Sequence, residues 1–232
     1  MGSWAEQGRV DIVAIIKSVK NGKLSIIKEI KRKKESANMY IFWDNSNLHI
    51  SGLEVVRPKM EPTSTRELFR TDFTKLFQLV HKNRHVNCAY LSGSVPPPSD
   101  GLWEYLRNMN IKLQLLDKTA TGKEQESVDM SLQTMMLRTA IDNDPSTLAI
   151  LTGDGAGKQL GEGFLSDLKR IKDKFNWDIE VYAWEMTCNR HLKDFAEHNG
   201  MFIRLEDYYE SVTYIQKDRF GKVAYYRDSK PL

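Results

Sequence analysis

The sequence has little cysteine and no long apolar run. Its only two cysteines, Cys88 and Cys188, lie far apart and belong to no paired motif. Such sparse cysteine argues against a disulfide scaffold and suits a reducing compartment, so an intracellular protein, cytoplasmic or nuclear, is expected. The sequence lacks the apolar run of about 18 residues that a membrane span needs, so no membrane association is expected. The first residues also lack the charged, apolar and small-residue order of a secretory signal.

Charge is distributed unevenly along the chain. The net charge is +3, yet residues 1–37 alone hold nine Lys/Arg against four Asp/Glu. One interpretation of this basic region is an arm that faces nucleic acid or serves as a nuclear localisation signal. The other is a helix with a solvated basic face, because apolar residues recur at helical spacing between Ile12 and Val19. Both interpretations stay open.

From residue 39 onwards, short apolar runs alternate with stretches of helical periodicity. The expected strands cover 39–44, 86–91, 111–116, 147–152, 178–184 and 201–205. The expected helices cover 66–82, 99–109, 126–142, 158–175 and 189–198. This order predicts one α/β domain over 38–211, a Rossmann-like three-layer sandwich whose mostly parallel central sheet has helices on both faces. Residues 212–232 are expected to form a C-terminal tail or hairpin.

Two aspartates follow expected strands. Asp44 ends the first strand and Asp154 comes after the fourth. In the common strand order 3-2-1-4-5 these strands are neighbours, so both carboxylates would face the crevice at the carboxyl edge of the sheet. Each residue also has a simpler explanation. Asp44 is a suitable turn or helix-cap residue, and Asp154 stands beside glycines as turn aspartates often do.

A third aspartate falls on the apolar side of an expected helix. At about 100° per residue, Asp129 lies within the arc that Val128, Leu132 and Met136 occupy. A buried carboxylate is costly unless it is paired or binds a cation. The positive end of the helix dipole contributes only about 0.3–1 kcal/mol, which is too little to offset burial. An acid at the edge of the core is the simpler alternative.

The three aspartates together indicate a metal site. At an effective dielectric constant near 20, two carboxylates about 4 Å apart repel each other by about 4 kcal/mol. Asp44, Asp129 and Asp154 would therefore take up protons or bind a cation if they converge. Oxygen ligands without nearby His or Cys favour Mg²⁺ or Mn²⁺ over zinc. Such an ion at a strand-end crevice suits phosphoryl chemistry.

Three segments of the chain resemble the NYN domains, which are PIN-like metal-dependent ribonucleases. They are FWDNSNL (42–48), KEQESVDMSLQ (123–133) and LAILTGDG (148–155), in that order on an alternating α/β chain. The resemblance implies a PIN-like fold and endonucleolytic cleavage of RNA with Mg²⁺ or Mn²⁺. It also implies that Asp44, Asp129 and Asp154 bind the metal and that Asn47 orients the first acid or the substrate phosphate.

One position departs from the family pattern. NYN domains usually carry a second acid two residues after the Asp154 position, where this chain has Ala156. Either metal occupancy or rate is reduced as a result, or Glu126 or Glu162 substitutes for the missing acid. The main alternative is therefore a catalytically weak module of the same fold that binds RNA or protein.

The substrate side of the expected site is basic. Lys118, Lys123 and Lys158 fall in loops or first turns near the expected crevice, where they would meet RNA phosphates. Lysines that only promote solubility are the alternative. Trp43 and Trp184 adjoin buried strands, so core packing is a better explanation for them than base stacking. A homodimer or another protein partner stays open.

A third function class fits part of the sequence. Adhesion-type domains bind Mg²⁺ through D-x-S-x-S at the end of a first strand and through a later acid. The segment DNSNL matches this pattern as far as Ser46, but Leu48 replaces the second serine. A metal-dependent protein-binding domain therefore ranks third, below the ribonuclease and the catalytically weak binding module.

Overall fold

The computed structural model of the 232-residue chain describes residues 16–20, 23–27, 38–94, 100–116, 124–155, 163–221, 223 and 225–232. For residues 16–20, 23–27, 94, 100, 116 and 124–129 it describes only the backbone. The chain divides into two units, Met1–Ser36 and Ala37–Leu232. None of the helices in the described part is long and apolar enough to cross a membrane.

In the first unit, the described backbone is a hairpin. β1 (Ile16–Lys20) pairs antiparallel with β2 (Lys23–Ile27), with Ile16 opposite Ile27. The helix that the apolar spacing allowed is therefore wrong over these residues. The reason is the Asn21-Gly22 pair between the two segments, a sequence signal for a two-residue hairpin turn, which the helical count ignored.

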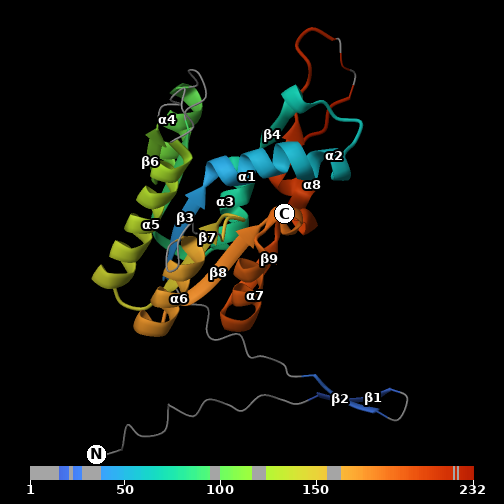
Figure 1. The fold of residues 1–232 in the computed structure, drawn as a ribbon. Coiled ribbons are helices and arrows are strands. Elements are labelled where there is room, and N and C mark those ends of the chain that lie inside the picture. The colour runs from blue at the N-terminus through green and yellow to red at the C-terminus, as the bar shows by residue number, and fades with distance from the viewer. Residues whose placement is uncertain are drawn as a thin grey trace, which may run out of the picture. The chain divides into compact units, whose positions relative to one another are not determined.

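The second unit is built on a six-stranded parallel sheet with the order β6-β5-β3-β7-β8-β9 (Figure 1). The strands are β3 (Asn38–Asp44), β5 (His85–Ser94), β6 (Ile111–Leu116), β7 (Thr147–Leu151), β8 (Asp178–Ala183) and β9 (Met201–Arg204). Read along the chain, this is the order 3-2-1-4-5-6, so the expected adjacency of the first and fourth strands is confirmed. The order in which strands are added to the sheet reverses between β3 and β7, the position where ligands bind in open α/β sheets.

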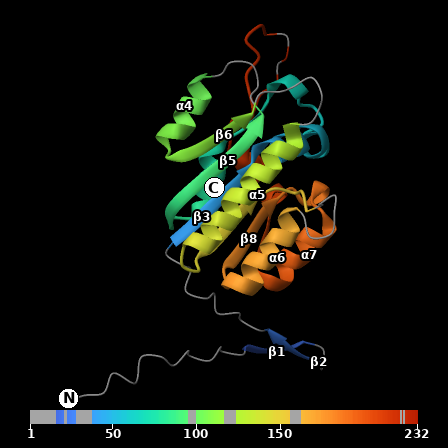
Figure 2. The same ribbon diagram turned by 60° about the vertical axis from the view of Figure 1, so that its left-hand side comes forward.

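Helices cover both faces of this sheet, which confirms the predicted α/β class and its PIN-like architecture (Figures 1 and 2). The helices are α1 (Asn45–Ser51), α2 (Arg57–Met60), α3 (Phe73–His81), α4 (Asp100–Asn108), α5 (Glu124–Asp142), α6 (Phe164–Phe175), α7 (Arg190–Asn199) and α8 (Tyr209–Val212). Short π or 3-10 turns occupy Gly52–Val56, Arg66–Leu68, Glu185–Thr187 and Leu205–Tyr208.

The side chains of β3 show how the layers are joined. Ile41 and Trp43 point to the face that α3, α4 and α8 cover, and Tyr40 and Phe42 point to the face that α5, α6 and α7 cover. All four are buried, because a strand at the centre of a parallel sheet has a hydrophobic layer on each side. This explains why the run before Asp44 is continuously apolar.

The expected helix 66–82 is interrupted. Residues Phe69–Thr71 form strand β4, which pairs antiparallel with β10 (Thr213–Ile215), and α3 begins only at Phe73. Asp72 ends the strand and caps the helix by accepting a 3.0 Å hydrogen bond from the Lys75 backbone N–H. The prediction was wrong here because Phe69 and Phe73, four residues apart, suggested one helical stripe.

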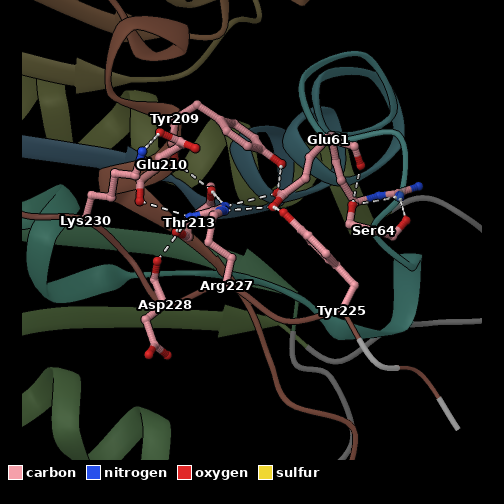
Figure 3. Close-up of polar contacts among 10 residues, drawn as sticks. Glu61, Ser64, Tyr209, Glu210, Thr213, Tyr225, Arg227, Asp228 and Lys230 are labelled. Atoms are coloured by element: carbon pink, nitrogen blue, oxygen red, sulfur yellow. Dashed lines mark hydrogen bonds and ion pairs between the residues drawn. The ribbon is translucent and has the colours of Figure 1, made fainter.

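The C-terminal segment is ordered on the body of the domain, around a buried ion pair (Figure 3). Arg227 Nε donates to Glu61 Oε1 at 2.7 Å, and both side chains are almost completely buried. Tyr209 and Tyr225 also donate to Glu61, and Arg227 Nη2 donates to Thr213 Oγ1. Ile215 and Arg227 form an antiparallel bridge, which joins the two ends of the segment between them.

Candidate active site at the carboxyl edge of the sheet

Asp44 is the last residue of the central strand and is buried, with 2% of its surface exposed. It lies opposite Ser92 of β5, while its neighbour Trp43 lies opposite Leu151 of β7. The chain leaves β3 and β7 at the same level, which brings Thr152 beside Asp44. The apolar run 39–43 lies between the two helical layers, and the acid follows at the carboxyl end of the strand.

Asp44 is also the N-cap of α1. Its Oδ1 accepts a 3.0 Å hydrogen bond from the backbone N–H of Asn47. The simpler explanation of Asp44 as a helix cap is therefore correct, but it accounts for only one of the two carboxylate oxygens. An exposed aspartate would serve a cap equally well, so burial needs a further reason.

Two cross-links join the loop after β3 to the loop after β7. Thr152 Oγ1 donates to Asp44 Oδ2 at 3.0 Å and accepts from the backbone N–H of Asp154 at 3.1 Å. Asn47 Oδ1 accepts from the backbone N–H of Gly153 at 2.8 Å. The structure thus brings together Asp44, Asn47 and Asp154, three of the residues that the sequence singled out.

The carboxyl group of Asp44 is perturbed by this environment. Burial is the largest influence, and the charge of Asp154 acts in the same direction, so the pKa of Asp44 rises to about 6. Hydrogen bonds from Asn47 and Thr152 act in the opposite direction and limit the rise. A carboxylate that is costly to ionise gains most from a bound cation.

Thr152 was missed by the sequence analysis. It is fully buried, and its hydroxyl connects Asp44 to the Asp154 backbone by acting as donor and acceptor at once. The available signal was a hydroxyl residue directly after a fully apolar strand, two positions before an acid. Only the pairing of β3 with β7 shows what that hydroxyl contacts.

The loop after β7 rests on the start of α7. Asn189 donates its backbone N–H to Gly153 O at 2.8 Å and caps α7 through its side chain. A Cβ added at Gly155 would lie 2.7 Å from Leu192 Cβ, so no larger residue fits without a shift. The glycines beside Asp154 therefore permit a close approach between this loop and the helix, a contact that sequence reasoning did not anticipate.

The backbone at position 129 lies toward the same edge of the sheet. α5 connects β6 to β7, so it runs antiparallel to these parallel strands and begins at their carboxyl ends. Asp129 is in its second turn, three residues before Leu132 and seven before Met136, both of which are buried. Glu126 is in the first turn of the same helix.

The other expected site residues lie outside the described part of the chain. They are Lys118, Lys123, Lys158, Glu162 and the departing position Ala156. Trp43 and Trp184 are described, and both are buried, so they belong to the core as expected.

The described donors suit a hard cation. Among the side chains that the structure describes, no three His, Cys, Asp or Glu gather to hold a metal ion. The two acids that do meet, Asp44 and Asp154, offer only oxygen, as Mg²⁺ and Mn²⁺ require. Beside Asp44, the buried Oδ1 of Asn45 accepts no hydrogen bond from a described residue. A buried polar oxygen without a protein partner usually bonds to a water or an ion.

Comparison with known proteins agrees with this arrangement. The family model of the NYN domain matches residues 38–200. A protein of unknown function from Vibrio parahaemolyticus RIMD 2210633, solved as a crystal structure, is similar with a TM-score of 0.53 and 14% identity over 76% of this chain and 97% of that chain. At this identity the likeness concerns the fold alone. No curated protein matches the sequence significantly.

The family match runs from β3 to the end of α7, and so it spans both strand-end loops that carry the buried acid and its cross-links. NYN domains are PIN-like, are generally nucleases and typically use divalent metals. From the sheet order, the site at the reversal of β3 and β7 and this match, the chain belongs to the NYN domain family.

Proposed function

We propose that this protein is a metal-dependent endoribonuclease that cleaves RNA phosphodiesters with Mg²⁺ or Mn²⁺. The observation that carries the proposal is the buried Asp44 carboxylate, cross-linked through Thr152 to the backbone of Asp154 at the reversal point of the sheet. A carboxylate kept in this position at a cost in desolvation is better explained by a bound cation than by helix capping alone.

In this proposal Asp44, Asp129 and Asp154 hold the ion. When bound, a divalent ion supplies an activated water and neutralises the charge that develops on the phosphate during in-line displacement. The residues of the chain hold the proposed ligands in position. Thr152 and the Asn47 backbone fix both oxygens of Asp44, and Asn47 holds the Gly153 backbone so that the Asp154 loop stays close. Such a rigid arrangement limits reorganisation during the reaction.

The second candidate is a catalytically weak RNA- or protein-binding module of the same fold. The observation that favours it is Ala156, which stands where NYN domains usually have a second acid. In the ribonuclease proposal Glu126 or Glu162 supplies the missing carboxylate, and Lys118, Lys123 and Lys158 meet the RNA backbone. Glu126 is in the first turn of α5, the helix that also carries Asp129, whereas Glu162 lies outside the described residues.

Incubation with RNA separates the two candidates. Circular single-stranded RNA, which has no ends, is incubated with the purified protein and Mn²⁺, Mg²⁺ or EDTA. The ribonuclease proposal expects linear fragments with either metal and none with EDTA. Binding without cleavage at every metal concentration would support the module instead.

Two variants connect any cleavage to the proposed site. Asp44→Asn and Asp154→Asn should each abolish cleavage, because each removes a charged ligand of the ion. Asp144→Asn is the matched control, since Asp144 is an exposed aspartate in the turn before β7, at the opposite edge of the sheet. Loss of activity in the control as well would show that the assay reports general damage or a contaminating nuclease.

A further inference from the structure

Beyond the region that matches the family, the described residues of the segment 216–226, which are 216–221, 223, 225 and 226, belong to a loop that projects from the body of the domain. In Figures 1 and 2 this loop, in red, extends from the end of the domain to which the strands of the central sheet point. Its base is closed by the bridge between Ile215 and Arg227 and by the Arg227–Glu61 ion pair. The loop is therefore anchored on the same side of the domain as the candidate active site.

The tip of this loop is braced by one aspartate. Asp218 Oδ1 accepts from the Phe220 backbone N–H at 3.0 Å, and its Oδ2 accepts from the Val223 backbone N–H at 2.9 Å. Gly221 provides a positive φ of 67° at the turn, a conformation that favours glycine. The negative charge of Asp218 is thus engaged in shaping the tip, which holds the backbone in a defined turn.

The side chains on this loop combine exposed aromatic rings with cations. Phe220 is 82% exposed and Tyr226 is 53% exposed, and Lys217 and Arg219 are exposed beside them. Lys217 Nζ lies 5.7 Å from the centre of the Tyr226 ring. Exposed rings interleaved with cations match unpaired nucleotides, whose bases stack on the rings and whose phosphates meet the cations.

We infer that the 216–226 loop is a binding site for single-stranded RNA, in which Phe220 and Tyr226 stack on unpaired bases and Lys217 and Arg219 contact phosphates. This inference rests on the proposed function, because it gives that site a substrate class: RNA that is unpaired where it passes the loop. A ring without neighbouring cations would fit a protein partner better. The alternation of charge and ring favours nucleic acid.

Binding is tested separately from cleavage, in the Asp44→Asn background. Fluorescence anisotropy measures the affinity for a fluorescein-labelled single-stranded oligouridylate and for an RNA duplex of the same length. Phe220→Ala should weaken oligouridylate binding about five-fold or more, since each stacked base contributes at this level. Phe220→Trp should retain the affinity, and duplex binding should be unchanged in both variants because its bases are not available to stack.

The charged residues are tested by salt dependence. Arg219→Gln should reduce the slope of log affinity against log salt by about 0.7, the value for one phosphate contact on a single strand. Ile141→Ala and Arg138→Gln are matched controls, because both residues are exposed and lie in the second half of α5, away from the loop. Neither control should change RNA affinity.

The outcomes distinguish this inference from the proposed function. If Phe220→Ala and Arg219→Gln fold as the parent protein does and bind oligouridylate equally well, the loop is not an RNA site, and a protein partner becomes the better explanation. Weakened binding by both variants supports the inference even if the wild-type protein cleaves no RNA. Cleavage by the wild-type protein with unchanged binding in the variants overturns the inference and leaves the ribonuclease proposal standing.

Discussion

Thr152 donates a 3.0 Å hydrogen bond to the buried carboxylate of Asp44, a residue 108 positions earlier in the chain. This bond ties the loop after the first strand of the sheet to the loop after the fourth. It also places the Asp154 backbone within reach of the same hydroxyl. Several measurable consequences depend on this pair and on the ion pair that anchors the C-terminal segment.

Divalent metal should stabilise the protein through Asp44. Mn²⁺ at about 100 times its Kd should add about 2.7 kcal/mol to the free energy of unfolding, because the ion binds the folded state alone. In Asp44→Asn this gain should largely disappear, while Asp144→Asn should retain it. Thermal unfolding with Mn²⁺ and with EDTA gives the comparison. An equal shift in Tm for wild type and Asp44→Asn would place the ion elsewhere.

Stability without metal should depend on pH in an unusual direction. Burial raises the pKa of Asp44 from 3.8 to about 6, so ionising this carboxyl group costs more free energy in the folded state than in the unfolded state. This group therefore favours folding at low pH, and its contribution is lost as pH rises from about 4 to about 6, by about 3 kcal/mol in total.

Asp44→Asn removes that titration. In EDTA, chemical denaturation of wild type and Asp44→Asn between pH 4 and pH 7 should show the variant gaining stability relative to wild type as pH rises. Parallel curves for the two proteins would mean that Asp44 has an ordinary pKa. Activity, in contrast, should fall below about pH 6, because the proton that Asp44 takes up there competes with the metal ion for the carboxylate.

Thr152→Val should lower the stability of the protein and raise the pKa of Asp44. Valine has a similar shape but neither donates to Asp44 nor accepts from the Asp154 backbone, so buried polar groups lose their partner at a cost of about 1–3 kcal/mol. The pKa of Asp44 should rise further because one hydrogen bond that lowers it is gone. The acid limb of the pH–rate profile should therefore move to higher pH. Thr152→Ser keeps the hydroxyl and should behave almost as wild type.

Glu61→Ala should destabilise the protein more than Glu54→Ala, which changes an exposed glutamate. It leaves Arg227 buried without a carboxylate, for which about 3–5 kcal/mol is typical. Glu54→Ala breaks the exposed ion pair with Arg66 and should cost less than about 1 kcal/mol. Urea denaturation measures both. If Glu61→Ala lowers the free energy of unfolding as little as Glu54→Ala does, the ion pair that anchors the C-terminal segment contributes little to stability.

The architecture was largely predictable because six short segments rich in apolar residues are separated by stretches of helical periodicity. The order of the strands followed from the common topology of such sheets. Errors occurred where a period was ambiguous. Phe69 and Phe73 share a helical spacing, yet they belong to a strand and to the next helix, since pairing with residues 213–215 outweighs the local pattern. Helical spacing also misled over residues 16–20, which pair as a strand with residues 23–27.

What the sequence alone determined is which acids end strands, because apolar runs and the residues that follow them are local features. Asp44 and Asp154 were identifiable on that basis. Only the tertiary structure decided that Thr152 bonds to Asp44, that Asn189 supports the Gly153 loop and that Arg227 pairs with Glu61, since each contact joins distant segments. The physical reason is that strand pairing sets which loops meet, and a buried polar group must find its partner among whatever those loops bring.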